Sequence, residues 1–177
     1  MRRERTPLRK GIEGFTLIEI VVVCVLIGII AAVIIPPLHQ GVQSFAVTET
    51  RGDLTSQARQ AATRMIRELR NIQKEADNTP NITGATATSL TFVDVLDNTI
   101  TFSVSGSTVQ RNSNPLVAQV SSLQFRYFNG SNAELTTLPL SATDRNNVRR
   151  IMVTLTLAEG SLTVSVTEQA YLRELSG

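Results

Sequence analysis

The sequence predicts an α+β protein in which a long N-terminal α-helix packs on an antiparallel β-sheet. Three patterns lead to this class. Residues 15–35 form a predominantly apolar run, and residues 42–75 repeat apolar side chains with the period of an amphipathic helix. After Pro80, apolar and polar residues alternate with a period of two, which is typical of half-buried strands. A chain of 177 residues has room for one modest domain and an appendage.

Charge is distributed unevenly along the chain. Of 17 basic and 15 acidic side chains, the first 14 residues hold five and two, so the rest holds 12 and 13 and is nearly neutral. The high pI therefore reflects the basic head, and the net charge of the body gives no support for nucleic-acid binding.

The apolar run is long enough to cross a membrane. Its 21 residues span about 31 Å as a helix, close to the roughly 30 Å of a bilayer core. The basic head should stay in the cytoplasm by the positive-inside rule, which places the C-terminal domain on the other side. Small residues suited to signal-peptide cleavage should follow an apolar run, but here Gly14 precedes it. We therefore expect the run to remain in the mature protein.

The segment G-F-T-L-I-E at residues 14–19, with its basic leader, apolar tail and Pro36, resembles the processing site of type IV prepilins and type II secretion pseudopilins. The resemblance implies cleavage after Gly14 by a prepilin peptidase and N-methylation of Phe15. Glu19 and Pro36 become residues five and twenty-two of the mature chain, both positions where the family commonly has them.

This resemblance also implies partners and a location. The partners are other pilin or pseudopilin subunits, the prepilin peptidase/methylase and an inner-membrane assembly platform. The chain would lie in the cytoplasmic membrane as a single-pass protein and then join a filament.

Four regions follow from this interpretation. They are a cleaved leader at 1–14, a transmembrane and filament-core helix at 15–37, the amphipathic half of the helix at 38–79, and a globular antiparallel β domain at 80–177. We expect a kink or local break at Pro36 and Pro37, because proline removes a backbone donor and clashes with the preceding turn.

Glu19 is unusual because a carboxylate in hydrocarbon costs at least about 2.5–3.5 kcal/mol. Cleavage would create a partner for it, the amine of Phe15, in the same subunit or in a neighbour. The family resemblance favours pairing between subunits. The alternative is that Glu19 only reaches the cytoplasmic headgroups, since it lies near the membrane edge.

The amphipathic helix should end within residues 77–80, which are rich in helix breakers. Its apolar stripe should pack on the sheet; it comprises Val47, Leu54, Ala58, Ala61, Met65, Leu69 and Ile72. The expected strands are residues 89–95, 99–105, 108–111, 117–128, 148–158 and 161–172. The polar stretch 129–147 is expected to be an irregular surface loop and a contact region.

Residues 65–71, 116–130 and 170–175 resemble the J class of minor pseudopilins and the W-type minor pilins. Cys24 is the only cysteine, so the chain cannot form the C-terminal disulfide usual in major type IVa pilins. It also shows no clear acidic calcium loop of the kind implied for major pseudopilins. Both absences favour a minor subunit, and we expect no metal and no cofactor.

Three functions compete at this point. The first is a structural and assembly subunit of a pilus or pseudopilus. The second is a DNA-uptake pseudopilin, for which Arg126, Tyr127 and Phe128 are the nearest basic and aromatic residues. The third is a membrane-anchored enzyme, which has little support because no catalytic set appears and His39 alone is not a metal signature.

Overall fold

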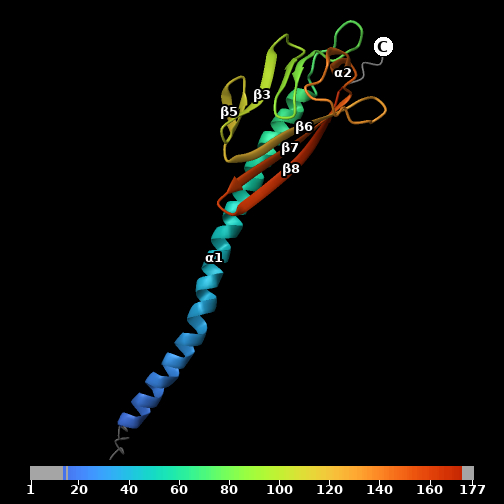
Figure 1. Ribbon diagram of the computed structural model, residues 1–177. Coiled ribbons are helices and arrows are strands. Elements are labelled where there is room, and N and C mark those ends of the chain that lie inside the picture. Colours follow the sequence, from blue (N-terminus) through green and yellow to red (C-terminus); the bar gives the residue numbers. More distant parts are fainter. Residues whose placement is uncertain (1–13, 15, 173–177) are drawn as a thin grey trace, which may run out of the picture. The chain divides into compact units, whose positions relative to one another are not determined.

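The computed structural model describes residue 14 and residues 16–172, except for the side chains of residue 36 and residues 38–46. The helix α1 (Leu17–Leu69) comes first, and the strands follow it (Figure 1). The chain divides into two compact units, Met1–Val47 and Thr48–Gly177, and each is described by itself. The predicted α+β class, with an N-terminal apolar helix followed by antiparallel strands in a pilin-like order, is confirmed.

All strands pair antiparallel, in two sheets instead of the single sheet that the sequence predicts. The five-stranded sheet contains β1 (Ile82–Ala85), β2 (Leu90–Val93), β3 (Thr99–Ser105), β4 (Thr108–Arg111) and β5 (Asn114–Val117), paired in that order. The three-stranded sheet contains β6 (Val120–Phe128), β7 (Arg150–Glu159) and β8 (Leu162–Tyr171). A short helix, α2 (Ala142–Asn146), lies between β6 and β7 in the chain.

The two sheets arise because the predicted strand at 117–128 is interrupted. Gln119 has a φ of 59°, a left-handed backbone conformation that no regular strand accommodates. The chain therefore leaves the first sheet after Val117 and enters the second at Val120. The strand β1 is a further difference, since four residues with only one large apolar side chain, Ile82, gave too weak a pattern to be predicted.

In the second unit, α1 contributes its predicted stripe to one core shared with both sheets. Leu54, Ala58, Met65 and Leu69 are all at most 1% exposed, and the same core includes Phe92 of β2 as well as residues of β6 and β7. Of the predicted stripe, Val47 alone is exposed, at 50%. The stripe therefore begins at Leu54.

The predicted end of the amphipathic helix is wrong. Helix α1 stops at Leu69, well before residues 77–80. Beyond it, the Gln73 amide donates to the Val93 carbonyl (2.8 Å), and the Val95 amide donates to the Asn71 carbonyl (3.0 Å). These bonds to the region of β2 take backbone groups that a longer helix would use, and helical periodicity alone does not reveal such competition.

The β7–β8 hairpin follows the prediction closely. Gly160 turns the chain with a φ of 58°, which glycine adopts without strain. The inward-facing residues Ile151, Val153 and Leu155 are fully buried, as their alternation indicates.

The stretch 129–147 is more ordered than the sequence suggests. Ser141 caps α2 by accepting a hydrogen bond from the Asp144 amide (3.1 Å), and Leu140 is 2% exposed. The Glu134 carboxylate pairs with the Arg126 guanidinium, which ties this stretch to β6.

Candidate assembly surface

The apolar half of α1 is not covered by any other part of the chain that the structure describes. The segment Leu17–Ile35 has a mean hydropathy of 3.2, and none of it is buried. Leu17 is 81% exposed and Ile27 is 60% exposed. At 1.5 Å per residue the 19 residues span about 28 Å, which suits a bilayer core. A surface of this composition is stable only when lipid or other protein covers it.

Glu19 lies in the first turn of α1, next to the start of the apolar face. Its amide donates to the Thr16 carbonyl (3.1 Å) and, more weakly, to Thr16 Oγ1 (3.4 Å). Thr16 therefore acts as the N-cap, and Glu19 takes the third helical position, where a carboxylate interacts favourably with the helix dipole. The spacing T-x-x-E at residues 16–19 is the sequence signal for this arrangement.

Gly14 lies outside the helix and is exposed. A Cβ added there would meet no described atom within 4 Å, and the φ of Gly14 is not in the left-handed region. Nothing in the described part of the chain therefore requires glycine at this position. A requirement for glycine would come from an external enzyme that acts on the segment. Phe15, the predicted new N-terminus, lies outside the described residues.

The helical backbone of α1 continues through Pro36 and Pro37. Of the two expected outcomes at this point, a kink or a local break, the local break is therefore absent. A kink without a break stays a prediction.

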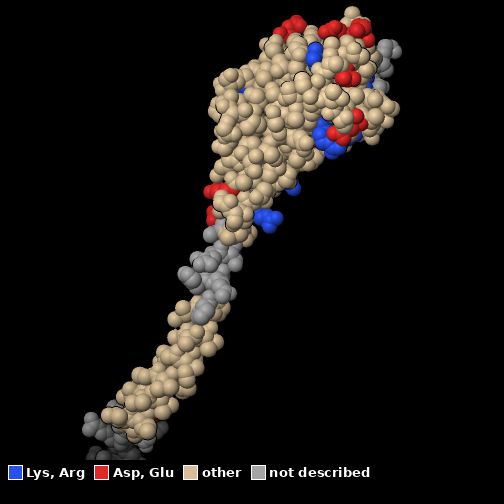
Figure 2. All heavy atoms as spheres, viewed as in Figure 1, with Lys and Arg blue, Asp and Glu red and all other residues tan. Residues whose placement is uncertain are grey.

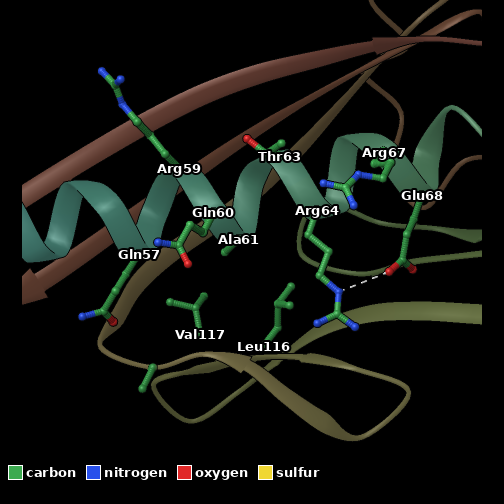
Figure 3. A pocket seen from close by; sticks show the side chains of 11 residues that line it. Gln57, Arg59, Gln60, Ala61, Thr63, Arg64, Arg67, Glu68, Leu116 and Val117 are labelled. Atoms are coloured by element: carbon green, nitrogen blue, oxygen red, sulfur yellow. Dashed lines mark hydrogen bonds and ion pairs between the residues drawn. The ribbon is translucent and has the colours of Figure 1, made fainter.

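In the second unit, the solvent-facing side of α1 borders hollows on both flanks. The larger, about 890 Å³, lies against residues 116–118 at the end of β5 (Figure 3). In Figure 3, Gln57 and Gln60 point toward Leu116 and Val117.

The acidic group of this hollow is already paired. The Glu68 carboxylate binds Arg111 Nε at 2.6 Å and Arg64 Nε at 3.5 Å. It therefore fixes α1 to β4 and offers little free negative charge.

Arginines of α1, together with Arg70 directly after it, give this exposed side a positive character. Among the described residues, Arg59, Arg67 and Arg70 take part in no ion pair. Acidic side chains gather on another part of this unit, over the loops that follow α1, β2 and β6 (Figure 2). There the Asn98 amide lowers the pKa of Asp94 by donating to its carboxylate.

The residues proposed for DNA contact are mostly covered. Tyr127 is fully buried, and its hydroxyl donates to the Thr86 carbonyl (2.8 Å). Phe128 is 7% exposed because the Arg150 guanidinium stacks on its ring at 3.8 Å. These rings cannot serve as an open platform for bases.

Arg150 was not singled out from the sequence. It is 9% exposed and donates to Gln169 Oε1 (2.9 Å) and Asn132 Oδ1 (2.5 Å). Its role is to cover Phe128 and to hold the stretch after β6. Nothing in the sequence around Arg150 signals this, because its partners are distant along the chain.

The described residues contain no group of three metal-ligating side chains. Of the described surfaces, the apolar half of α1 is the one that requires lipid or protein to cover it.

A comparison with known families gives one match. Residues 9–35 match the family described as the prokaryotic N-terminal methylation motif. No curated protein matches the chain. The matched range contains Gly14, Phe15, Glu19 and the whole apolar segment Leu17–Ile35. The chain therefore carries, at residues 9–35, the N-terminal signature of the type IV prepilins and pseudopilins.

Proposed function

We propose that this chain is a structural and assembly subunit of a type IV pilus or a type II secretion pseudopilus. One observation carries the proposal. The methylation signature coincides with an apolar helix that leaves its side chains exposed in the single chain. Such a helix needs a membrane before assembly and neighbouring helices after it.

In this proposal a prepilin peptidase removes residues 1–14 on the cytoplasmic side and Phe15 is methylated. The segment 15–37 anchors the chain and later enters the filament core. The rest, including the second half of α1 and both sheets, lies outside the cytoplasmic membrane. Neighbouring subunits and an inner-membrane assembly platform are its partners.

We further propose a minor subunit, related to the J-class pseudopilins or W-type pilins. The support is the resemblance of residues 65–71, 116–130 and 170–175, together with the single cysteine. The covered rings of Tyr127 and Phe128 leave the DNA-uptake alternative without its main support.

Exchange of Glu19 for Leu tests the assembly role. We expect Glu19→Leu to insert into the membrane as well as the parent or better, because it removes a polar group from the apolar segment. Crosslinking to partner subunits should fall, since the Phe15 amine would be buried without its counter-charge at a cost of roughly 3–5 kcal/mol. Abundance in the membrane fraction and crosslinked yield are measured in the same cells.

Glu49→Leu is the matched control, because Glu49 is an exposed carboxylate of α1 outside the apolar segment. It should crosslink like the parent. If Glu19→Leu is present, cleaved and crosslinked at parental levels, then Glu19 does not pair with a neighbour's amine. The headgroup interpretation of Glu19 would then stand instead.

A further inference from the structure

The edges of the two sheets differ in how they are protected from pairing with another chain. At the β1 edge, the ladder is shifted between Ile82 and Gly84, and the Ala85 carbonyl accepts from the Leu140 amide (2.9 Å). The β5 edge is only four residues long and contains Pro115. Short strands, proline and irregular pairing all prevent the addition of another strand.

The outer edge of β6 is also occupied. The Phe125 amide donates to the Ala87 carbonyl (2.7 Å), and the Leu135 amide donates to the Tyr127 carbonyl (2.8 Å). Loops therefore cover this edge with backbone hydrogen bonds.

The β8 edge has none of these protections. It is ten residues long, it pairs with β7 through ten consecutive positions without a register shift, and it contains no Pro, Gly, Lys or Arg. Glu168 is its one charged residue. A long, regular edge with a single charged residue is the kind that accepts an added strand.

The register identifies the backbone groups that such a strand would bind. The Leu172 amide donates to the Arg149 carbonyl (2.9 Å), so even-numbered residues of β8 face β7 with their backbone groups. The residues whose backbone N–H and C=O groups point away from β7 are the odd-numbered Thr163, Ser165, Thr167, Gln169 and Tyr171. No backbone hydrogen bond from another described element reaches these five residues.

Beside this edge lies a groove between β8 and α1. Two hollows of about 550 and 460 Å³ form it, and both are lined by Thr63 and Glu168. Arg59 lines the first hollow, whereas Arg67 and Arg70 line the second. In Figure 3, Arg59 and Thr63 point away from the β5 side of α1.

The groove is positively charged. Its three arginines form no ion pair among the described residues, and Glu168 is the one carboxylate in its lining. A strand added at β8 would place alternate side chains toward this groove. Carboxylates at those positions would complement the arginines.

We propose that β8 binds an extended, acidic segment of another protein as an additional strand. Backbone hydrogen bonds to the odd-numbered residues would supply affinity, and the three arginines of the groove would select for carboxylates. The proposal goes beyond the filament role and does not depend on it, since edge and groove both belong to the second unit.

The test uses the full chain in detergent micelles and a labelled synthetic peptide that alternates valine with glutamate. Fluorescence anisotropy should show saturable binding of this peptide. The same peptide with lysine in place of glutamate should bind at least about tenfold more weakly, because it meets the arginines with like charge.

A pair of variants separates backbone pairing from simple charge attraction. Ser165→Pro removes one outward amide, and proline is tolerated on an edge strand. Ser165→Ala loses the same hydroxyl but keeps the amide. We expect about tenfold weaker binding for Ser165→Pro and less than about twofold change for Ser165→Ala. Equal binding by both variants, equal binding of both peptides, or no binding of the glutamate peptide would overturn the proposal.

Hydrogen exchange provides a readout that does not rely on a folded proline variant. In the free chain, the amides of Thr163, Ser165 and Thr167 should exchange quickly, while those of Val164 and Val166 should be protected by β7. The glutamate peptide should slow exchange at the three outward amides. Unchanged exchange there, with peptide bound, would mean that the peptide lies elsewhere.

Discussion

At the residue scale, Glu19 has a local role at the start of α1 and a proposed role in pairing between subunits. Its amide is capped by Thr16, and its carboxylate occupies the third position of α1, so it helps to begin the helix directly after the proposed cleavage point. Capping explains why a polar pair is tolerated at the edge of the apolar segment. Capping does not explain why assembly would need a carboxylate at this position. Pairing with a neighbour's amine would explain it.

Thr16→Ala distinguishes these two roles. Loss of the hydroxyl should cost the helix start about 1 kcal/mol while leaving the Glu19 carboxylate in place. We therefore expect Thr16→Ala to crosslink to partner subunits nearly as well as the parent, in contrast to Glu19→Leu. Equal losses in the two variants, with leader cleavage complete in both, would assign Glu19 a purely local role.

Gly14→Leu should leave the leader attached. The described fold has open space around Gly14, so the variant should be inserted and folded like the parent. The expected defect is that a bulky, branched side chain does not fit where the peptidase uses the small size and backbone freedom of glycine. Gel mobility of the membrane-bound chain checks this. Gly52→Leu, at another open position, should be cleaved normally.

At the element scale, the second half of α1 is a core element and not a free stalk. Leu69 is fully buried, so Leu69→Asp places an unpaired charge in the core. We expect a loss larger than the roughly 2–5 kcal/mol of a buried Leu→Ala change, enough to unfold the domain. The measurement is circular dichroism of residues 45–177, which should be soluble and folded in the parent form.

Thr63→Asp is the control, because Thr63 is exposed on the same helix. It should melt within a few degrees of the parent. If Leu69→Asp also melts at the parental temperature, the stripe is not core and the architecture is wrong.

The stretch after β6 should be sensitive to acid. The Arg126 guanidinium lowers the pKa of Glu134 by donating a hydrogen bond to its carboxylate. Because the pKa of Glu134 is lower in the folded state, the ionised carboxylate stabilises the fold at any pH above its ordinary pKa of about 4.3. This stabilisation of the fold is lost as the pH falls through the lower, folded-state pKa. Thermal midpoints of the parent and Glu134→Gln should therefore differ at pH 7 and converge below about pH 4. A difference in thermal midpoint that stays constant down to pH 3 would show that the ionised Arg126–Glu134 pair contributes nothing to the stability of the fold.

At the scale of the whole molecule, sequence patterns predicted what depends on local repetition. The apolar segment follows from a nearly continuous apolar run, and the stripe from Leu54 to Leu69 and the β7–β8 hairpin follow from periodicity. Sequence patterns did not predict that α1 ends at Leu69 or that the predicted strand is interrupted at Gln119. The helix end depends on backbone hydrogen bonds to the region of β2. The interruption depends on a left-handed backbone conformation at a residue that is not glycine.

The residues of the candidate sites also fall into those that sequence patterns predict and those that they do not. Glu19 and Gly14 could be identified because their spacing relative to the apolar run carries the signal. The groove beside β8 could not, since it needs the arginines of α1 and the edge strand to be brought together from residues about 100 apart in the chain.

The central claim is that residues 1–14 are removed and that the apolar helix remains. Intact-mass analysis of the chain extracted from membranes of a host with active prepilin peptidase tests it most directly. The expected mass is that of residues 15–177 with one hydrogen of the terminal amine replaced by a methyl group. A chain that still begins at Met1 in that host, or one cleaved after the apolar segment, would contradict it.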